Sequence, residues 1–171
     1  MGDYAEQMVK NAAIVQLLQP VSLNGLTNGT PISLKGWDHC TIVINTGAIA
    51  VGTAAVTLTQ DTSVTATGSV KALAFTTYYT NSGVDAGTLG AVGVSTLFPV
   101  VQATTALTLD TANATYVIEV DADTLDVTLG FDTLRPIWSN PGGADLAQVT
   151  AILTKGRFVG AAQTIKDVTI D

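Results

Sequence analysis

Acidic side chains recur at every second position within the stretch YVIEVDADTLD, residues 116–126. Successive side chains of a β-strand point to opposite faces, so a strand here would place Glu119, Asp121 and Asp123 on one face. Carboxylate oxygens are ligands that Ca²⁺ prefers, but neighbours on a strand face stand about 7 Å apart at the backbone. The three residues could share a calcium ion only if the chain bends near them, and they are the candidate metal ligands of this sequence.

The spacing of these acids does not follow the EF-hand calcium loop. Counted from Asp121, the fifth position is Leu125, which cannot be a ligand, and the sixth is Asp126, where the loop needs glycine. A strand face that is covered by water, or that meets Lys and Arg of a partner, requires no special spacing. We therefore expect a solvated or contacting strand face with no metal and no cofactor, and keep a calcium site as the alternative.

Two carboxylates across a cleft could also hydrolyse a glycosidic bond, at a separation of about 5 Å or about 6.5–9.5 Å. Glu119 could form such a pair with Asp110 or Asp132. Binding clefts are lined mainly by apolar and aromatic side chains, and aromatic residues make up only 6% of this chain. We therefore predict no catalytic residue and no enzymatic activity.

His39 and Cys40 are neighbours in the segment GWDHC, residues 36–40. Adjacent residues of a strand point to opposite faces, so His39 cannot readily activate Cys40 as a nucleophile or join it as a metal ligand. We expect Cys40 to be buried and His39 to lie at the surface or to be hydrogen-bonded. We expect Trp37 and Trp138 to pack at the edge of the core rather than to stack on a ligand.

The composition favours protein contact over contact with nucleic acid or membrane. The net charge is −7 with only 7 Lys and Arg residues, whereas binding to phosphates or anionic lipids takes clustered basic residues. No apolar run reaches the length of a membrane span, and the N-terminal residues lack the pattern of a signal peptide. Charged residues make up 12% of the chain, against about 25% in typical domains. Because interface centres are poor in charge, we expect the protein to assemble with other protein chains.

Short strands separated by turn residues are predicted from about residue 21 to 134, which indicates an all-β fold. The segment AAVTLTQ, residues 54–60, alternates apolar and polar residues as a half-buried strand does. Pro99 within TLFPVVQ favours an edge strand. The other expected strands are CTIVINTG (40–47), KALAFTTYY (71–79), ALTLDT (106–111), TYVIEVD (115–121), LDVTLGF (125–131) and AQVTAILTKGRF (147–158).

The length of 171 residues suits one domain. Residues 4–19 fit a helix or a short strand, and we expect Pro20 to end either element. The predicted organisation is an N-terminal arm at 1–20, followed at 21–171 by a single-domain β-sandwich or jelly-roll-like body. The glycine-rich segment at 81–95 is expected to be a mobile loop that makes contacts.

Several segments between Gln19 and Phe158 follow one another in a defined order: QPVSLNG, PISLKGWDHCTIVINTG, AAVTLTQDTSV, KALAF, YVIEVDADTLD, GFDTLR and AILTKGRF. This order resembles a family of small structural proteins that decorate or cement the heads of tailed bacteriophages. The resemblance implies a β-sandwich on the capsid exterior of the virion, assembled in the host cytoplasm. It also implies that the protein contacts the major capsid protein and is itself a homo-oligomer, often a trimer at a local threefold position. It implies no enzymatic residues.

The expected function is therefore a structural virion protein that decorates or stabilises a phage capsid by protein–protein assembly. One alternative is another virion module, associated with a tail or fibre. A second is a non-catalytic carbohydrate-binding β-sandwich, with or without Ca²⁺ held by Asp121 and Asp123. The carbohydrate-binding alternative requires an exposed Trp37 or Trp138, so the burial of these two rings discriminates between the classes.

Overall fold

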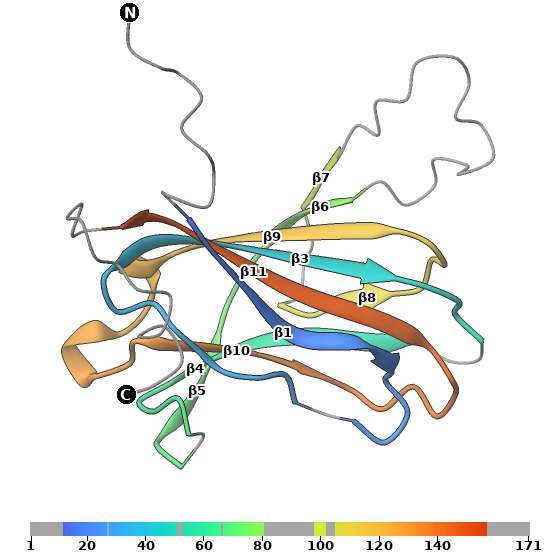
Figure 1. Cartoon of the computed structure of the whole chain (residues 1–171), viewed down its shortest axis with the longest axis horizontal. Helices are drawn as coiled ribbons and strands as arrows, with labels where there is room; N and C mark the ends of the chain where they lie inside the picture. The colour runs from blue at the N-terminus through green and yellow to red at the C-terminus, as the bar shows by residue number, and fades with distance from the viewer. Residues whose placement is uncertain are drawn as a thin grey trace, which may run out of the picture.

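The computed structural model describes residues 12–26, 28–50, 53–65, 67–80, 98–101 and 105–156. These residues form two antiparallel sheets packed face to face, an all-β sandwich (Figure 1). Within the described residues, two single-turn 3₁₀ segments accompany the strands. The predicted fold class is therefore confirmed.

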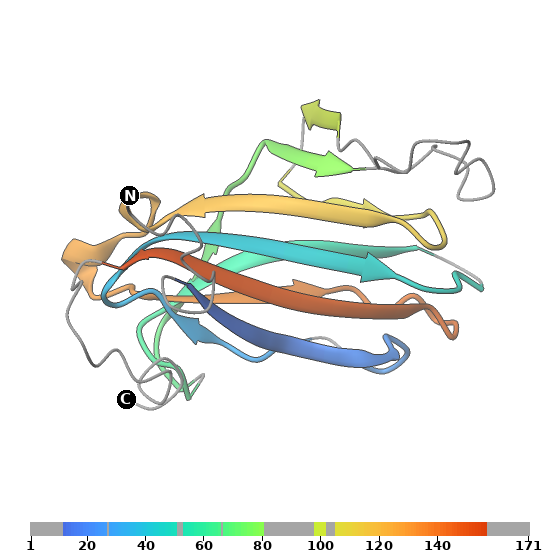
Figure 2. The same cartoon turned by 45° about the horizontal axis from the view of Figure 1, so that its top comes forward.

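One sheet has six strands in the order β1-β11-β3-β9-β6-β7. Its strands are β1 (Ala13–Ser22), β11 (Leu146–Gly156), β3 (Trp37–Thr46), β9 (Thr115–Asp121), β6 (Thr77–Thr80) and β7 (Phe98–Val101). The four long strands β1, β11, β3 and β9 lie side by side and make one broad face (Figure 2).

The second sheet has five strands, with β2-β10-β4-β5 in order and β8 paired with β4. Its strands are β2 (Ile32–Ser33), β10 (Thr133–Trp138), β4 (Ala54–Asp61), β5 (Val70–Leu73) and β8 (Leu107–Leu109). The 3₁₀ segments η1 (Ala122–Thr124) and η2 (Val127–Leu129) connect β9 of the first sheet to β10 of the second.

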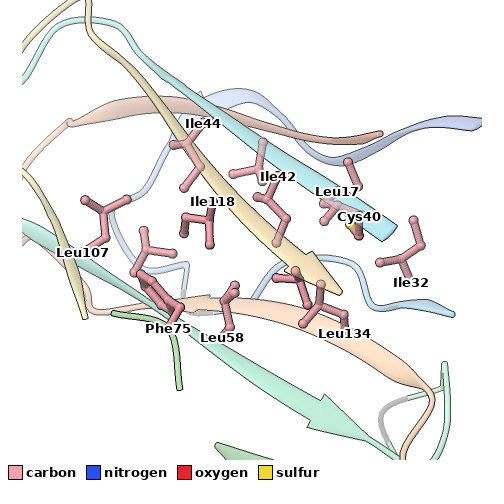
Figure 3. Packing of buried hydrophobic residues seen from close by; sticks show 14 of the residues in the cluster. Leu17, Ile32, Cys40, Ile42, Ile44, Leu58, Phe75, Leu107, Ile118 and Leu134 are labelled. Carbon is pink, nitrogen blue, oxygen red and sulfur yellow. The ribbon is translucent and has the colours of Figure 1, made fainter. Parts of the chain in front are cut away.

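The core lies between the two sheets and follows from strand alternation. On β3, Ile42 and Ile44 are fully buried, whereas Val43 between them is half-buried on the other face. Figure 3 shows Ile42 and Ile44 on one side of the core and Leu58 and Leu134 of the other sheet opposite them. Each fully buried side chain of this size contributes about 1.5–3 kcal/mol relative to an exposed one, so apolar residues at period two hold the two layers together.

The N-terminal strand corrects two expectations. Residues 13–20 belong to strand β1 of the six-stranded sheet, which agrees with the strand alternative for residues 4–19 and not with the helix or with an arm up to residue 20, so the sandwich begins before residue 21. Pro20 does not end the strand, which continues to Ser22. The strand tolerates it because β1 is at the end of the sheet order and its pairing with β11 is irregular between Leu18 and Val21. Residues 1–11 of the predicted arm lie outside the described residues.

The strand predicted at LDVTLGF, residues 125–131, is wrong. The chain leaves β9 at Asp121 and turns through η1 and η2, and Gly130 ends η2 in the left-handed conformation with φ 83°. KALAFTTYY is also not one strand, because β5 and β6 belong to different sheets. Pro99 lies in β7, at the end of the six-stranded order, as predicted for an edge strand. The loop predicted at 81–95 lies outside the described residues.

Strand β10 is present although the sequence pattern TLRPIW does not predict it. Its Pro136 lacks a backbone N–H, but the Pro136 carbonyl accepts a hydrogen bond from the N–H of Gly29 at 2.8 Å. A Cβ at Gly29 would lie 2.7 Å from the Pro136 Cγ atom, closer than real Cβ contacts come. Glycine at this position therefore allows the chain to run close beside the proline.

Candidate functional site

The structure separates the three candidate metal ligands. Glu119 and Asp121 are exposed on one face of β9, as the alternation predicts. Asp123 is not on that strand face, because β9 ends at Asp121 and Asp123 lies in η1. No group of three or more His, Cys, Asp or Glu residues in the described part of the chain is arranged to hold a metal ion.

Glu119 and Asp121 instead hold a histidine between them. In the antiparallel pairing of β3 with β9, His39 lies directly opposite Asp121. The His39 Nδ1 atom is 2.7 Å from Asp121 Oδ1, and its Nε2 atom is 2.6 Å from Glu119 Oε2. The Thr41 hydroxyl donates a further hydrogen bond to the same Glu119 oxygen at 2.8 Å. We call His39, Glu119 and Asp121 the His39 clamp.

The geometry of the clamp favours the charged imidazolium form of His39. Both ring nitrogens face carboxylate oxygens, which accept hydrogen bonds, and both nitrogens carry a proton only in the imidazolium. Partial burial lowers the pKa of His39, but the hydrogen bonds to Asp121 and Glu119 and the charges of these carboxylates together raise it above its ordinary value. The clamp thus joins β3 to β9 most strongly when the histidine is protonated.

The clamp is poorly suited to nucleophilic catalysis. A general base needs a nitrogen free to take a proton from a nucleophile, whereas both nitrogens of His39 contact carboxylates. Cys40 points to the opposite side of β3, is fully buried, and has a pKa raised to about 12 by burial. The buried Cys40 and hydrogen-bonded His39 confirm the sequence prediction for both residues.

In each carboxylate pair considered for glycoside hydrolysis, the two acids lie on or next to different sheets. Asp110 follows β8 and Asp132 precedes β10, both in the five-stranded sheet. Glu119 is exposed on the six-stranded sheet and contacts His39 and Thr41. Tyr116 donates a hydrogen bond to Asp110, and Thr133 donates one to Asp132. These contacts give each acid a structural partner other than a second carboxylate.

The six-stranded sheet has a broad surface turned away from the core, which we call the outer face. The central positions of this face are uncharged: Ile14 and Gln16 of β1, Gln148, Thr150 and Ile152 of β11, Thr41, Val43 and Asn45 of β3, and Thr115 of β9. The charged residues of these four strands gather at one end, where the His39 clamp lies with Asp38 and Lys155. The outer face is therefore uncharged over most of its length and acidic at one end.

The two tryptophans do not offer a platform for a sugar ring. Trp37 and Trp138 are both buried members of the core cluster, so they pack within the core and not at its edge as predicted. The Trp138 Nε1 atom is buried without a hydrogen-bond partner among the described residues. Both rings thus lack the exposure that the carbohydrate-binding alternative requires.

The role of His39 in the clamp was not predicted from the sequence. Alternation within CTIVINTG and TYVIEVD shows which residues share a face of one strand, but it does not show that the two strands pair. The available signal is His39, two residues before Thr41. The strand that carries them could pair with the strand that carries Glu119 and Asp121. The register that joins them is formed between residues 80 or more positions apart.

In the described part of the chain, no helix is long and apolar enough to cross a membrane. Comparison of the chain with protein-family models, with curated proteins and with solved structures finds no match.

Proposed function

We propose that the protein is a structural module without enzymatic activity, which assembles with other proteins through the outer face of its six-stranded sheet. The observation that carries this proposal is the absence of charge over most of that face. Protein interfaces are depleted in charged residues at their centres. A chain with net charge −7 that keeps one broad face uncharged has a surface fit for close contact.

The size of the outer face indicates what kind of contact it makes. Four strands about 4.8 Å apart, with an average of roughly seven uncharged positions at about 3.3 Å per residue, cover on the order of 400 Å². A stable interface of standard size buries about 800 Å² on each partner. One such contact is therefore weak by itself, and many copies on a repeating lattice would bind strongly through multivalency.

The lattice that we propose is a phage capsid. The segment order resembles head decoration proteins, and this role combines a small non-catalytic β-sandwich with many identical sites. The protein would then bind the major capsid protein on the exterior of the virion and stabilise the shell. A tail or fibre role would use the same chemistry, but no feature of the described residues favours it over the head.

Sedimentation with undecorated capsids of the phage that encodes the protein tests this function. We expect the wild-type protein to pellet with the capsids. Thr150→Lys, which places a charge at the centre of the outer face, should weaken binding tenfold or more, because an interface that buries an unpaired charge is strongly disfavoured.

Thr108→Lys is the matched control, since Thr108 is exposed on β8 of the other sheet. This variant should pellet like the wild type. If the wild-type protein stays in the supernatant, the capsid role is wrong. If both variants bind as the wild type does, the outer face is not the binding surface.

A further inference from the structure

Two Asn-Gly pairs, Asn24-Gly25 and Asn28-Gly29, follow β1 within a few residues of each other. In an Asn-Gly pair the backbone nitrogen of the glycine can attack the side-chain amide of the asparagine, since glycine has no Cβ to hinder the approach. This reaction, deamidation, converts the asparagine to an acid without an enzyme. The two pairs have the same composition, so their local structures decide how fast each reacts.

The first pair lies in an exposed turn. The Leu26 N–H donates to the Leu23 carbonyl at 3.0 Å across this turn, and Gly25 has φ 76°. A Cβ built on Gly25 would meet no atom within 4 Å. The Asn24 side chain makes no hydrogen bond to another described residue. The side-chain amide and the backbone of this pair therefore have room to approach each other.

The attacking nitrogen of the first pair is held only by a weak contact. The Gly25 N–H donates to Asn140 Oδ1 at 3.2 Å in an exposed position, at the long end of the range for such bonds. Water can replace Asn140 at little cost, because the net contribution of a hydrogen bond of this kind is small. The Gly25 nitrogen is thus open to solvent base, which must remove its proton before it attacks.

The second pair is held against β10. Asn28 forms a β-bridge with Ile137, and the N–H of buried Gly29 donates to the Pro136 carbonyl at 2.8 Å. A Cβ on Gly29 would lie 2.7 Å from Pro136 Cγ, so the backbone here is packed tightly. Ring closure requires the backbone to rotate until the glycine nitrogen faces the asparagine side chain. Asn28 can therefore react only when this part of the chain opens locally.

We propose that Asn24 is a site of spontaneous deamidation and that pairing with β10 protects Asn28. The deprotonated Gly25 nitrogen forms a bond to Asn24 Cγ, and the side-chain nitrogen leaves as ammonia. The cyclic imide that results takes up one water molecule. Opening of the ring at one carbonyl gives aspartate, and opening at the other gives isoaspartate. The reaction requires only water and base.

Either product adds a negative charge to the turn, and isoaspartate also lengthens the main chain by a CH₂ group. Ser22, just before the turn, pairs with Leu146 at the first residue of β11. His39 of the clamp pairs with Thr154 near the other end of β11 (Figure 1). Deamidation therefore places a charge at the end of the sandwich away from the acidic clamp. The inference rests on the turn alone and does not depend on the proposed function.

Peptide mapping by mass spectrometry, after incubation at mildly alkaline pH, tests the proposal. Trypsin releases both pairs in the peptide 11–35, and fragmentation of this peptide locates the exchange of NH₂ for OH. In the folded wild-type protein we expect Asn24 to deamidate on the order of tenfold faster than Asn28, because Asn28 must first lose its pairing with β10. In guanidinium chloride, which removes the turn and the pairing, the two rates should become similar.

The variant Gly25→Asn tests the attacking nitrogen. Asparagine tolerates the left-handed conformation of this position, but its side chain hinders the approach of the backbone nitrogen to Asn24. We expect deamidation of Asn24 to slow severalfold and that of Asn28 to stay the same. Gly130→Asn is the matched control, since Gly130 has φ 83° and open space around it, far from the turn in the sequence. This control should deamidate at Asn24 like the wild type.

Equal rates at Asn24 and Asn28 in the folded protein, or a faster loss of Asn28, would overturn the proposal. So would an Asn24 that stays intact in the folded protein while it reacts in denaturant. An Asn24 that reacts as fast in Gly25→Asn as in the wild type would reject attack by the backbone nitrogen. Capsid binding takes no part in these measurements, so the two proposals can fail independently.

Discussion

At the scale of the residue, protonation of His39 is linked to the pairing of β3 with β9. The pKa of His39 is raised above its ordinary value of 6.5 in the folded protein, because the two carboxylates outweigh the effect of burial. A raised pKa means that the folded protein binds the proton more tightly than the unfolded chain. The resulting stabilisation is fully present below pH 6.5 and is lost as the pH rises through the folded-state pKa.

His39→Gln should therefore lower stability mainly at acidic pH. We expect the variant to lose about 0.5–1 kcal/mol of unfolding free energy at pH 6, the range of partly exposed ion pairs, and little at pH 9. Urea denaturation at both pH values measures the difference. The other charged residues at this end of the sheet, Asp38, Asp123 and Lys155, are unchanged in the variant, so they do not contribute to the difference between variant and wild type through their removal. Equal losses at both pH values would show that the clamp does not depend on protonation.

Cys40 should be inert in the folded protein. It is fully buried and its pKa is raised to about 12, so very little thiolate is present at pH 8. A thiol reagent that absorbs on reaction should label less than a tenth of the protein under native conditions in an hour, and all of it in denaturant. Rapid native labelling would mean that the core opens readily near β3.

At the scale of the element, clean alternation predicted strands where one face is buried and the other is not. β4, β9 and β11 follow their predicted segments, whereas β10 escapes prediction because Arg135 and Pro136 interrupt its pattern. The segment 125–131 alternates as well as these strands, yet it forms a turn. Alternation of apolar and polar residues indicates that a segment can form a strand. Whether it does so depends on the presence of a partner strand with which it can pair.

Gly29→Ala tests how close the chain before β2 runs to β10. The added Cβ would lie 2.7 Å from Pro136 Cγ, so we expect a loss of about 1–3 kcal/mol, as for other overpacked sites. Gly25→Asn is the control, since Gly25 has φ 76° with open space around it, and asparagine tolerates that conformation. Chemical denaturation measures both, and a Gly29→Ala variant as stable as the wild type would contradict the close approach.

At the scale of the whole molecule, the sheet order brings distant segments together. β11, near the end of the described residues, lies between β1 and β3, and β9 lies on the other side of β3. This order collects the uncharged positions of four strands into one face and places their charged residues at one end. It also turns the acids of the opening stretch toward a histidine and leaves Asp123 outside the group.

A chelator should leave the melting temperature unchanged within about 1 °C, because the described acids form no group that could hold a metal ion. Ligands that bind the folded state raise its stability, so removal of a bound Ca²⁺ would lower the melting temperature. Thermal melts with and without chelator, and with added Ca²⁺, measure this. A drop of several degrees with chelator, restored by Ca²⁺, would establish the calcium site that we do not expect.

The sequence by itself determined the all-β class, the alternation of β4 between a buried and a less buried face, the burial of Cys40 and the edge position of the strand with Pro99. These properties depend on the polarity of each residue and on the period of two, which are local. Only the tertiary structure decided that His39 faces Asp121, that Pro20 lies within β1, and that Asp123 lies outside the His39 clamp. Strand pairing and register depend on the packing of the whole core and on the closure of long loops, so neighbouring residues alone do not specify them.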